Sequence, residues 1–327
     1  MKAIEARELT KSYGDVQALD GLSFSVERGS VFGLLGPNGA GKSTTVKILT
    51  TLSRPDAGTA TVMGHDVLGD PAEVRKAIGV VAQRSGADIQ ATGRENLRLQ
   101  GQVFGLSGSG LEERIDGLLA QFGLADAADR LVRTYSGGMQ RRLDIALALV
   151  HGPQVLFLDE PTTGLDPEVR AEMWDEIRRL TGEGLTVLLT THYLEEADAL
   201  ASALAIVDRG RVVVAGTPDE LKRDLHGDAI HVELTEEREL DTLRTAINGS
   251  IGGLGEIQLS DRMLHARAAD GARAVPAMLT ALEEAGIGIA AVTVARPSLD
   301  DVYLRHAGRT FSAAETETNN NNKEESR

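Results

Sequence analysis

A glycine-rich segment near the N-terminus has the residue types needed to bind phosphate. Its residues are Gly36, Pro37, Asn38, Gly39, Ala40, Gly41, Lys42 and Ser43, followed by Thr44, and they fit the pattern G-x-x-x-x-G-K-[ST]. Glycines let the backbone curl until its N–H groups converge on phosphate oxygens, and the N-terminus of a following helix adds partial positive charge. We therefore expect Lys42 to reach the β- and γ-phosphates of a nucleotide and the Ser43 hydroxyl to take one Mg²⁺ position.

The flanking segments decide whether this pattern is a phosphate loop or a glycine-rich turn that only resembles one. Residues 31–35 form an apolar run that predicts a buried strand, and residues 44–52 carry Val46, Leu49 and Leu52 at helical spacing. A loop between a strand and a helix is the context in which this motif binds phosphate.

Two carboxylates follow a second apolar run. Residues 155–158 are Val-Leu-Phe-Leu, which is typical of a parallel strand buried on both faces. Such a strand presents Asp159 and Glu160 at its carboxyl end, where ligands of open α/β sheets bind. A further apolar strand at 185–190 precedes Thr191 and His192. A lone histidine is usually structural, but this one is expected at a strand end beside the same site.

Two other features are ambiguous when taken alone. Ser136, Gly137 and Gly138 precede a helical pattern, so they could bind an anion with free backbone N–H groups or simply begin a helix. Tyr13 lies in a short segment between two strand candidates, at residues 4–10 and 22–26, and could be a half-buried turn residue.

The order of the predicted elements gives the domain organisation. Strands alternating with helices around a phosphate loop predict a doubly wound α/β domain over residues 1–217, with a helical subdomain at about 84–150. Residues 218–310 repeat none of its motifs, and their β-α-β-β-α-β order predicts a small ferredoxin-like α+β domain. Residues 311–327 are rich in charge and asparagine and are expected to be disordered.

Composition narrows the classes of partner. The chain has 327 residues, a net charge of −15 and no cysteine, so nucleic acid is disfavoured as a partner and a disulfide framework is excluded. The N-terminus is too charged for a signal peptide, and no apolar run approaches the roughly 18 residues of a membrane span. If the protein acts at a membrane, another chain must span it.

Residues 2–217 closely resemble the ATP-binding subunit of ABC transporters, because the diagnostic motifs of that family appear in order. The resemblance implies that Tyr13 stacks on adenine, that residues 36–44 are the Walker A motif, and that Gln83 contacts Mg²⁺ and senses the membrane subunit. It also implies that Asp159 holds Mg²⁺ through water. The remaining implied roles are catalytic glutamate for Glu160, switch histidine for His192, and contact with ATP held by a second subunit for Ser136, Gly137, Gly138 and Asp166.

Two positions depart from the family pattern. The signature begins with Tyr135 and continues to Met139, where the family usually has Leu-Ser-Gly-Gly-Gln, although Ser136 and both glycines are present. Thr163 and Gly164 replace the more usual Ser-Ala before Leu165 and Asp166.

The resemblance also implies a function. It predicts a Mg²⁺-dependent ATPase that works as a homodimer on the cytoplasmic face of the cell membrane, bound to a separate integral membrane permease. Residues 218–310, ending in Ser-Leu-Asp-Asp-Val-Tyr-Leu, are similar to the accessory domain of the daunorubicin-resistance type, which implies drug or antibiotic efflux. A generic dimer-stabilising or regulatory domain is the alternative there. For the whole chain, the alternative is a soluble ABC-type ATPase acting on DNA or ribosomes.

Overall fold

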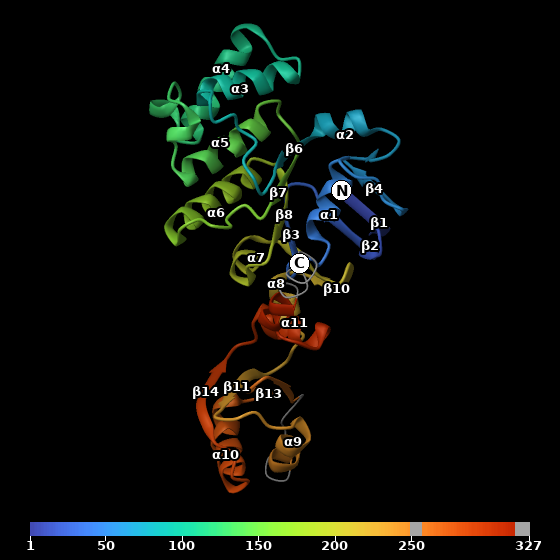
Figure 1. Ribbon diagram of the computed structural model, residues 1–327, viewed down its shortest axis with the longest axis vertical. Coiled ribbons are helices and arrows are strands. Elements are labelled where there is room, and N and C mark those ends of the chain that lie inside the picture. The colour runs from blue at the N-terminus through green and yellow to red at the C-terminus, as the bar shows by residue number, and fades with distance from the viewer. Residues whose placement is uncertain (249–256, 318–327) are drawn as a thin grey trace. The chain divides into compact units, whose positions relative to one another are not determined.

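The computed structural model describes residues 1–248 and 257–317, which form two compact units, Met1–Ala215 and Gly216–Arg327 (Figure 1). In the part of the chain that it describes, no helix is both long enough and apolar enough to cross a bilayer.

The first unit is built on a six-stranded sheet whose central strands are parallel. Its strand order is β10-β9-β3-β8-β7-β6. β3 and β8 are buried along their whole length, as is β7 except for its last residue, because their side chains face helices or a second sheet on both faces. The strands are β3 (Val31–Leu35), β6 (Ile78–Val81), β7 (Val155–Asp159), β8 (Thr186–Thr191), β9 (Ala203–Asp208) and β10 (Arg211–Gly216). The predicted doubly wound α/β architecture is confirmed.

A second, antiparallel sheet has the order β2-β1-β4-β5. Its strands are β1 (Lys2–Tyr13), β2 (Val16–Glu27), β4 (Ala57–Val62) and β5 (His65–Asp66). The first two are longer than the sequence predicted, because bulges in their pairing let the strands continue past the interruptions in apolar alternation. The expected turn position of Tyr13 is therefore wrong: it is the last residue of β1.

Two apolar cores lie on opposite faces of the parallel sheet. One joins α1 (Lys42–Leu49) and the antiparallel sheet to inward-facing residues such as Leu34 and Phe157. The other joins the helical subdomain to residues such as Leu156 and Leu189. The remaining helices of the unit are α2 (Pro71–Ala77), which the sequence did not predict, α3 (Gly93–Val103), α4 (Gly108–Gln121), α5 (Gly137–Leu149), α6 (Pro167–Gly182) and α7 (Leu194–Leu200), with short 3-10 turns at Ala125–Ala127 and Val132–Thr134.

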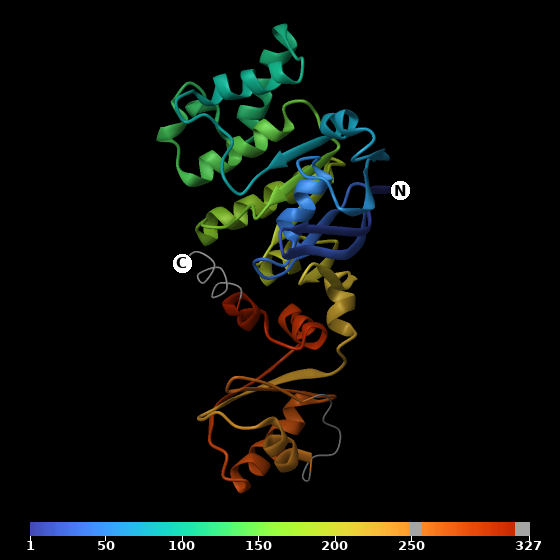
Figure 2. The ribbon, with the colours of Figure 1, turned by 45° about the vertical axis from the view of Figure 1, so that its right-hand side comes forward.

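The second unit has the predicted β-α-β-β-α-β order, and its strand order, β12-β13-β11-β14, with every neighbouring pair antiparallel, is that of a ferredoxin-like sheet. Helices α9 and α10 cover one face of this sheet, and α11 lies on the other (Figure 2). The elements are α8 (Pro218–Arg223), β11 (Asp228–Leu234), α9 (Leu240–Asn248), β12 (Gln258–Ser260), β13 (Met263–Ala268), α10 (Gly271–Glu284), β14 (Ile289–Ala295) and α11 (Leu299–Ala307).

The start of the expected disordered tail is ordered instead. Residues 311–317 are helical, with Phe311 and Ala314 buried, and the Phe311 ring packs edge-on against Tyr303 at 5.0 Å between centroids. Phe311 supplies an apolar anchor that the polar composition of the segment hid. Residues 318–327 of the predicted tail lie outside the described residues.

A histidine pair under α11 is expected to make the stability of this unit depend on pH. His231 and His265 are paired across β11 and β13 with their Nδ1 atoms 3.0 Å apart, and the Asp301 carboxylate is 3.6 Å from His231 Nε2. Burial lowers the pKa of His265, and the neighbouring His231 lowers it further, whereas Asp301 and Asp300 oppose that effect. His265 is therefore protonated less readily in the folded chain than in the unfolded chain, where the pKa of histidine is about 6.5.

The free energy of unfolding of this unit should therefore fall as the pH is lowered through the range below about 7. His265→Gln, which cannot be protonated, should remove that part of the loss. We expect the wild-type Tm to fall by about 2–4 °C more than the variant Tm between pH 7.5 and 5.5. Calorimetry on the full chain measures both, and equal Tm losses would show that His265 does not cause the effect.

Candidate active site

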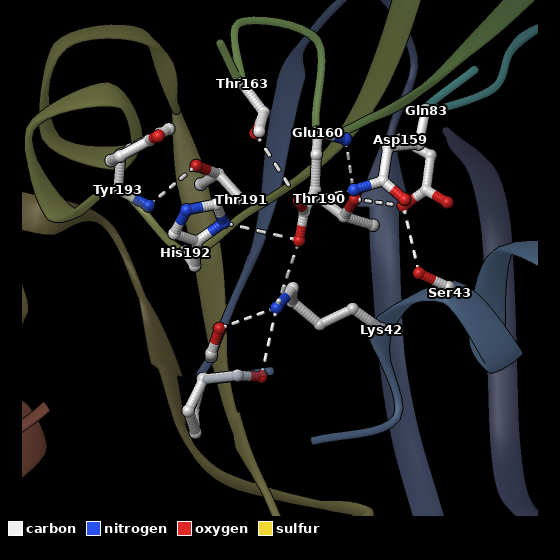
Figure 3. A network of polar contacts seen from close by, with 12 residues as sticks. Lys42, Ser43, Gln83, Asp159, Glu160, Thr163, Thr190, Thr191, His192 and Tyr193 are labelled. Atoms are coloured by element: carbon white, nitrogen blue, oxygen red, sulfur yellow. Dashed lines mark hydrogen bonds and ion pairs between the residues drawn. The ribbon is translucent and has the colours of Figure 1, made fainter. Parts of the chain in front are cut away.

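The candidate residues meet at the carboxyl ends of four neighbouring strands. The glycine-rich loop leaves β3, Asp159 ends β7 and Glu160 follows it, His192 follows β8, and Gln83 follows β6 (Figure 3). Since the carboxyl ends of parallel strands lie at one edge, segments more than a hundred residues apart supply a single site.

The backbone of the glycine-rich loop leaves no room for other residues at two points. A Cβ on Gly36 would lie 2.3 Å from the Val207 carbonyl oxygen, and Gly41 has a φ of +106° directly before α1. The glycines therefore set a backbone path that side chains would block. Pro37, Asn38, Gly39 and Ala40 complete the loop between them, and Ser43 and Thr44 lie in the first turn of α1.

Lys42 is buried at the start of α1, and its ammonium group faces inward. Its Nζ donates to the carbonyl oxygens of Gly36 at 2.7 Å and Pro37 at 3.0 Å, and it lies 3.7 Å from Glu160 Oε1. One cation thus lies between the loop that can hold a phosphate chain and the carboxylate that follows β7. This is the position from which an ammonium group can neutralise phosphate charge.

Three oxygen-bearing side chains gather beside it. Ser43 Oγ donates to Asp159 Oδ1 at 3.3 Å, and Thr190 Oγ1 donates to the same oxygen at 2.5 Å. Hydroxyl and carboxylate oxygens are the ligands that Mg²⁺ prefers, and Mg²⁺ commonly uses few protein ligands and several waters. The chemistry of this donor set therefore fits the predicted Mg²⁺ position of Ser43 and Asp159.

Glu160 is held in a strained position by several contacts. Its φ is +48°, uncommon for a residue with a Cβ, and its backbone N–H donates to Thr190 Oγ1 at 3.1 Å. The contact with His192 does most to hold the pKa of Glu160 below its ordinary value; burial opposes it and the charge of Lys42 supports it. The carboxylate is therefore ionised at neutral pH and can accept a hydrogen bond from a water molecule.

Gln83 and His192 both touch Glu160. Gln83 Nε2 donates to Glu160 Oε2 at 3.4 Å, and His192 Nδ1 lies 3.3 Å from Oε1. Thr163 Oγ1 also donates to Oε2, at 3.4 Å. The catalytic candidates predicted from separate motifs are thus brought into one network around a single carboxylate (Figure 3).

Apart from members of the glycine-rich loop and Thr44, five predicted residues lie outside this network. Ser136 caps α5 by accepting from the Met139 N–H at 3.3 Å, and both Ser136 and Gly137 are exposed. Tyr13 is 48% exposed, and its hydroxyl is 3.3 Å from Ser53 Oγ. Among the residues that the structure describes, no hydrogen bond or ion pair joins the network to the group Tyr13, Ser136, Gly137, Gly138 and Asp166.

The departures at Tyr135 and Met139 have a packing explanation. Tyr135 is buried, its hydroxyl donates to the Ala127 carbonyl at 2.6 Å, and Met139 packs against the same core of the helical subdomain. Both side chains therefore fill the interior beneath the signature segment, whereas Ser136 and Gly137 remain on the surface.

Sequence reasoning missed Thr190 and Thr163. Thr190 ends a run that reads as an ordinary buried strand, so only its position next to β7 shows that it orients both Asp159 and Glu160. Thr163 was noted only as a departure from the family pattern.

Comparison with known proteins shows a family match for each of the two units. Residues 19–163 match the family described as ABC transporter, and residues 216–307 match the family described as ATP-binding protein DrrA1-3-like, C-terminal domain. Among solved structures, the ADP conformation of MJ1267, an ATP-binding cassette of an ABC transporter, has a TM-score of 0.63 and 26% identity over 67% of this chain and 92% of that one.

Similar full-length proteins cover both units. Daunorubicin resistance ATP-binding protein DrrA3 of Streptomyces coeruleorubidus is 48% identical over 94% of this chain and 96% of its own. Doxorubicin resistance ATP-binding protein DrrA of Mycobacterium tuberculosis is 44% identical over 92% of each. Nod factor export ATP-binding protein I of Ralstonia nicotianae is 40% identical over 92% of each.

Proposed function

This chain belongs to the ATP-binding subunits of ABC transporters, of the daunorubicin-resistance type, and we propose that it hydrolyses ATP to drive export of an antibiotic-like compound through a separate membrane permease. The observation that supports the hydrolytic role is the network that joins Lys42, Gln83 and His192 to Glu160. Each of these side chains comes from a different segment, and all converge on the position where the γ-phosphate and its attacking water would meet.

The residues of this network divide the work of phosphoryl transfer between them. Lys42 and the loop N–H groups neutralise the phosphates, and Glu160 orients and polarises the attacking water. His192 holds the Glu160 carboxylate and contacts the γ-phosphate, and Gln83 reports the state of the site to the permease. Ser43 and Asp159 would hold Mg²⁺, which would supply further charge neutralisation on the phosphates when bound.

Two copies of the chain would form the complete site. Ser136 and Gly137 are exposed at the start of α5, on the opposite face of the parallel sheet from α1. They can therefore contact nucleotide held by a second copy, and Asp166, exposed at the start of α6, can do the same. Because this sequence carries one set of every motif, we propose a homodimer with two composite sites. Tyr13 would stack on the adenine of its own site.

An apolar groove beside Gln83 offers a docking surface for the permease. It has a volume of about 340 Å³ and is lined by residues that include Leu52, Val80 and Phe104. Leu52 is 75% exposed and Val80 is 37% exposed, although both are apolar. Exposed apolar surface rimmed by polar groups is typical of protein interfaces. We propose that a helix of the permease occupies this groove, which would place the chain at the cytoplasmic face of the membrane.

Leu52→Glu should separate transport from basal hydrolysis. A carboxylate in an apolar interface is strongly unfavourable, so co-purification with the permease should weaken at least about tenfold. Basal ATPase activity of the isolated chain should stay unchanged, because none of the side chains of the network lines the groove in which Leu52 lies. Pull-down from detergent-solubilised membranes and the ATPase rate measure the two quantities.

Leu68→Glu is the matched control, since Leu68 is 49% exposed and does not line the groove. It should leave permease binding intact. If both variants bind the permease as well as wild type does, the groove is not the docking surface.

The cargo is tested by drug accumulation in cells that express this chain together with its permease. We expect lower intracellular anthracycline with wild type than with Lys42→Ala. Relatives named for daunorubicin or doxorubicin resistance are 44–48% identical and those named for Nod factor export 40–42%, which favours drug-like cargo. Equal accumulation in both strains would argue against drug efflux.

A further inference from the structure

Two buried charged residues on α5 have no part in the scheme above. Arg141 and Asp144 are each 7% exposed and lie three residues apart, on one side of the helix that begins at Ser136. Burial lowers the pKa of Arg141 and raises that of Asp144. Isolated charges in such a position are strongly unfavourable, so their hydrogen-bond partners decide what they do.

Arg141 binds the backbone on both sides of Glu160. Its Nε donates to the Pro161 carbonyl at 2.8 Å and its Nη2 to the Asp159 carbonyl at 3.3 Å, while Nη1 donates to the Ala82 carbonyl at 2.7 Å. One planar guanidinium thus joins the segment after β7 to the segment after β6. Three carbonyls at fixed directions match the donors of arginine, and lysine cannot reproduce this pattern.

Asp144 binds the backbone beyond Gln83. Its Oδ1 accepts from Ser85 Oγ at 2.7 Å and from the Gly86 N–H at 3.2 Å. Ala82 and Ser85 flank Gln83 in sequence, so the loop that carries this glutamine is held to α5 on both sides. The Gln83 side chain remains free to contact Glu160.

We propose that Arg141 and Asp144 act as a clamp, here called the loop clamp, that fixes Gln83 and Glu160 to the helix that begins with the signature segment. Both are positioning residues, because neither touches the expected nucleotide. Engagement of Ser136 by nucleotide in a second copy would move α5 and, through the loop clamp, the Gln83 loop that adjoins the permease groove. This inference rests on the proposed ATPase function. It assigns the mechanical link between the second copy and the permease to Arg141 and Asp144.

Asp144→Ala and Arg141→Gln should each lower kcat for ATP about ten- to a hundredfold, since small displacements of a catalytic group have effects of that size. The KM for ATP should change less than about twofold, because the glycine-rich loop is not touched. Asp144→Asn keeps an oxygen that accepts both hydrogen bonds and should restore most of the activity. Arg142→Gln is the matched control on the same helix, since Arg142 pairs with Glu172 instead.

Loop order gives a readout that does not depend on hydrolysis. The chain has no cysteine, so a single nitroxide at Arg84→Cys reports the mobility of the Gln83 loop alone. Its spectrum should sharpen with Asp144→Ala but not with Asp144→Asn or Arg142→Gln.

Folded Asp144→Ala and Arg141→Gln proteins with a wild-type kcat and an unchanged nitroxide spectrum would overturn the loop clamp. A higher KM with unchanged kcat would also overturn it. Failure of the proposed function is distinguishable, because wild-type protein would then hydrolyse no ATP whereas the nitroxide spectra would still respond to Asp144→Ala.

Discussion

Glu160→Gln should lower the ATPase rate by at least about a hundredfold while nucleotide binding persists, because general-base assistance contributes an effect of that size. The substitution keeps the shape of the side chain and its ability to accept hydrogen bonds from Gln83 and Thr163. It removes the negative charge that polarises water beside the γ-phosphate. Single-turnover hydrolysis measures the loss, and equilibrium titration with a fluorescent ATP analogue measures retained binding.

The same variant should accumulate as an ATP-bound dimer, because nucleotide joining two copies is no longer cleaved. Light scattering after size exclusion with MgATP reports its mass. Glu168→Gln is the matched control, since Glu168 is exposed in the first turn of α6. If Glu160→Gln hydrolyses ATP within about threefold of wild type, Glu160 is not the group that activates water.

Lys42→Ala should strongly weaken nucleotide binding. Lys42 is 4% exposed and its ammonium group is the cation of the network around Glu160. Loss of one partner of a buried charged interaction corresponds to about 2–5 kcal/mol, so the Kd for ATP should rise roughly thirtyfold or more. Calorimetric titration of nucleotide measures it.

Lys47→Ala tests whether charge alone explains that loss. Lys47 belongs to the same helix but is exposed, so the Lys47→Ala protein should bind ATP as wild type does. Equal affinities of the Lys42→Ala and wild-type proteins would show that the loop does not hold the phosphates.

The sequence predicted those parts of the site whose structure depends on residues that are adjacent in the chain. The glycine-rich loop requires glycine at Gly36 and Gly41, and an apolar strand followed by two carboxylates can be recognised without knowing its neighbours. The same reasoning found the core strands, because a parallel strand buried on both faces reads as one apolar run.

The rest depends on contacts between segments that are far apart in sequence. Thr190 orients Asp159 across 31 residues, and Arg141 reaches Ala82 across 59. The residues that neighbour Thr190 and Arg141 in sequence do not indicate these partners, because both contacts follow only from the order of the strands and the placement of the helix. Phe311 shows the same limit: one aromatic side chain orders a segment whose composition predicts disorder.

The departure at Tyr135 illustrates the reverse case. From the sequence, Tyr135 looked like a change in the nucleotide-binding signature. In the fold, its hydroxyl donates to the Ala127 carbonyl inside the helical subdomain. A Cβ on Gly93 would lie 2.5 Å from the oxygen of the same hydroxyl. The position is therefore constrained by packing, and the surface of Ser136 and Gly137 is left unchanged.

The composite site is tested most directly by mixing two inactive variants. Lys42→Ala damages the phosphate loop of its own site, whereas Ser136→Arg damages the signature that a copy presents to its partner. In a mixed dimer, both defects fall in one site, and the other site has an intact loop from one copy and an intact signature from the other. A random equimolar mixture should therefore recover about a quarter of the wild-type ATPase rate. Activity no higher than that of either variant alone would contradict a site shared between two copies.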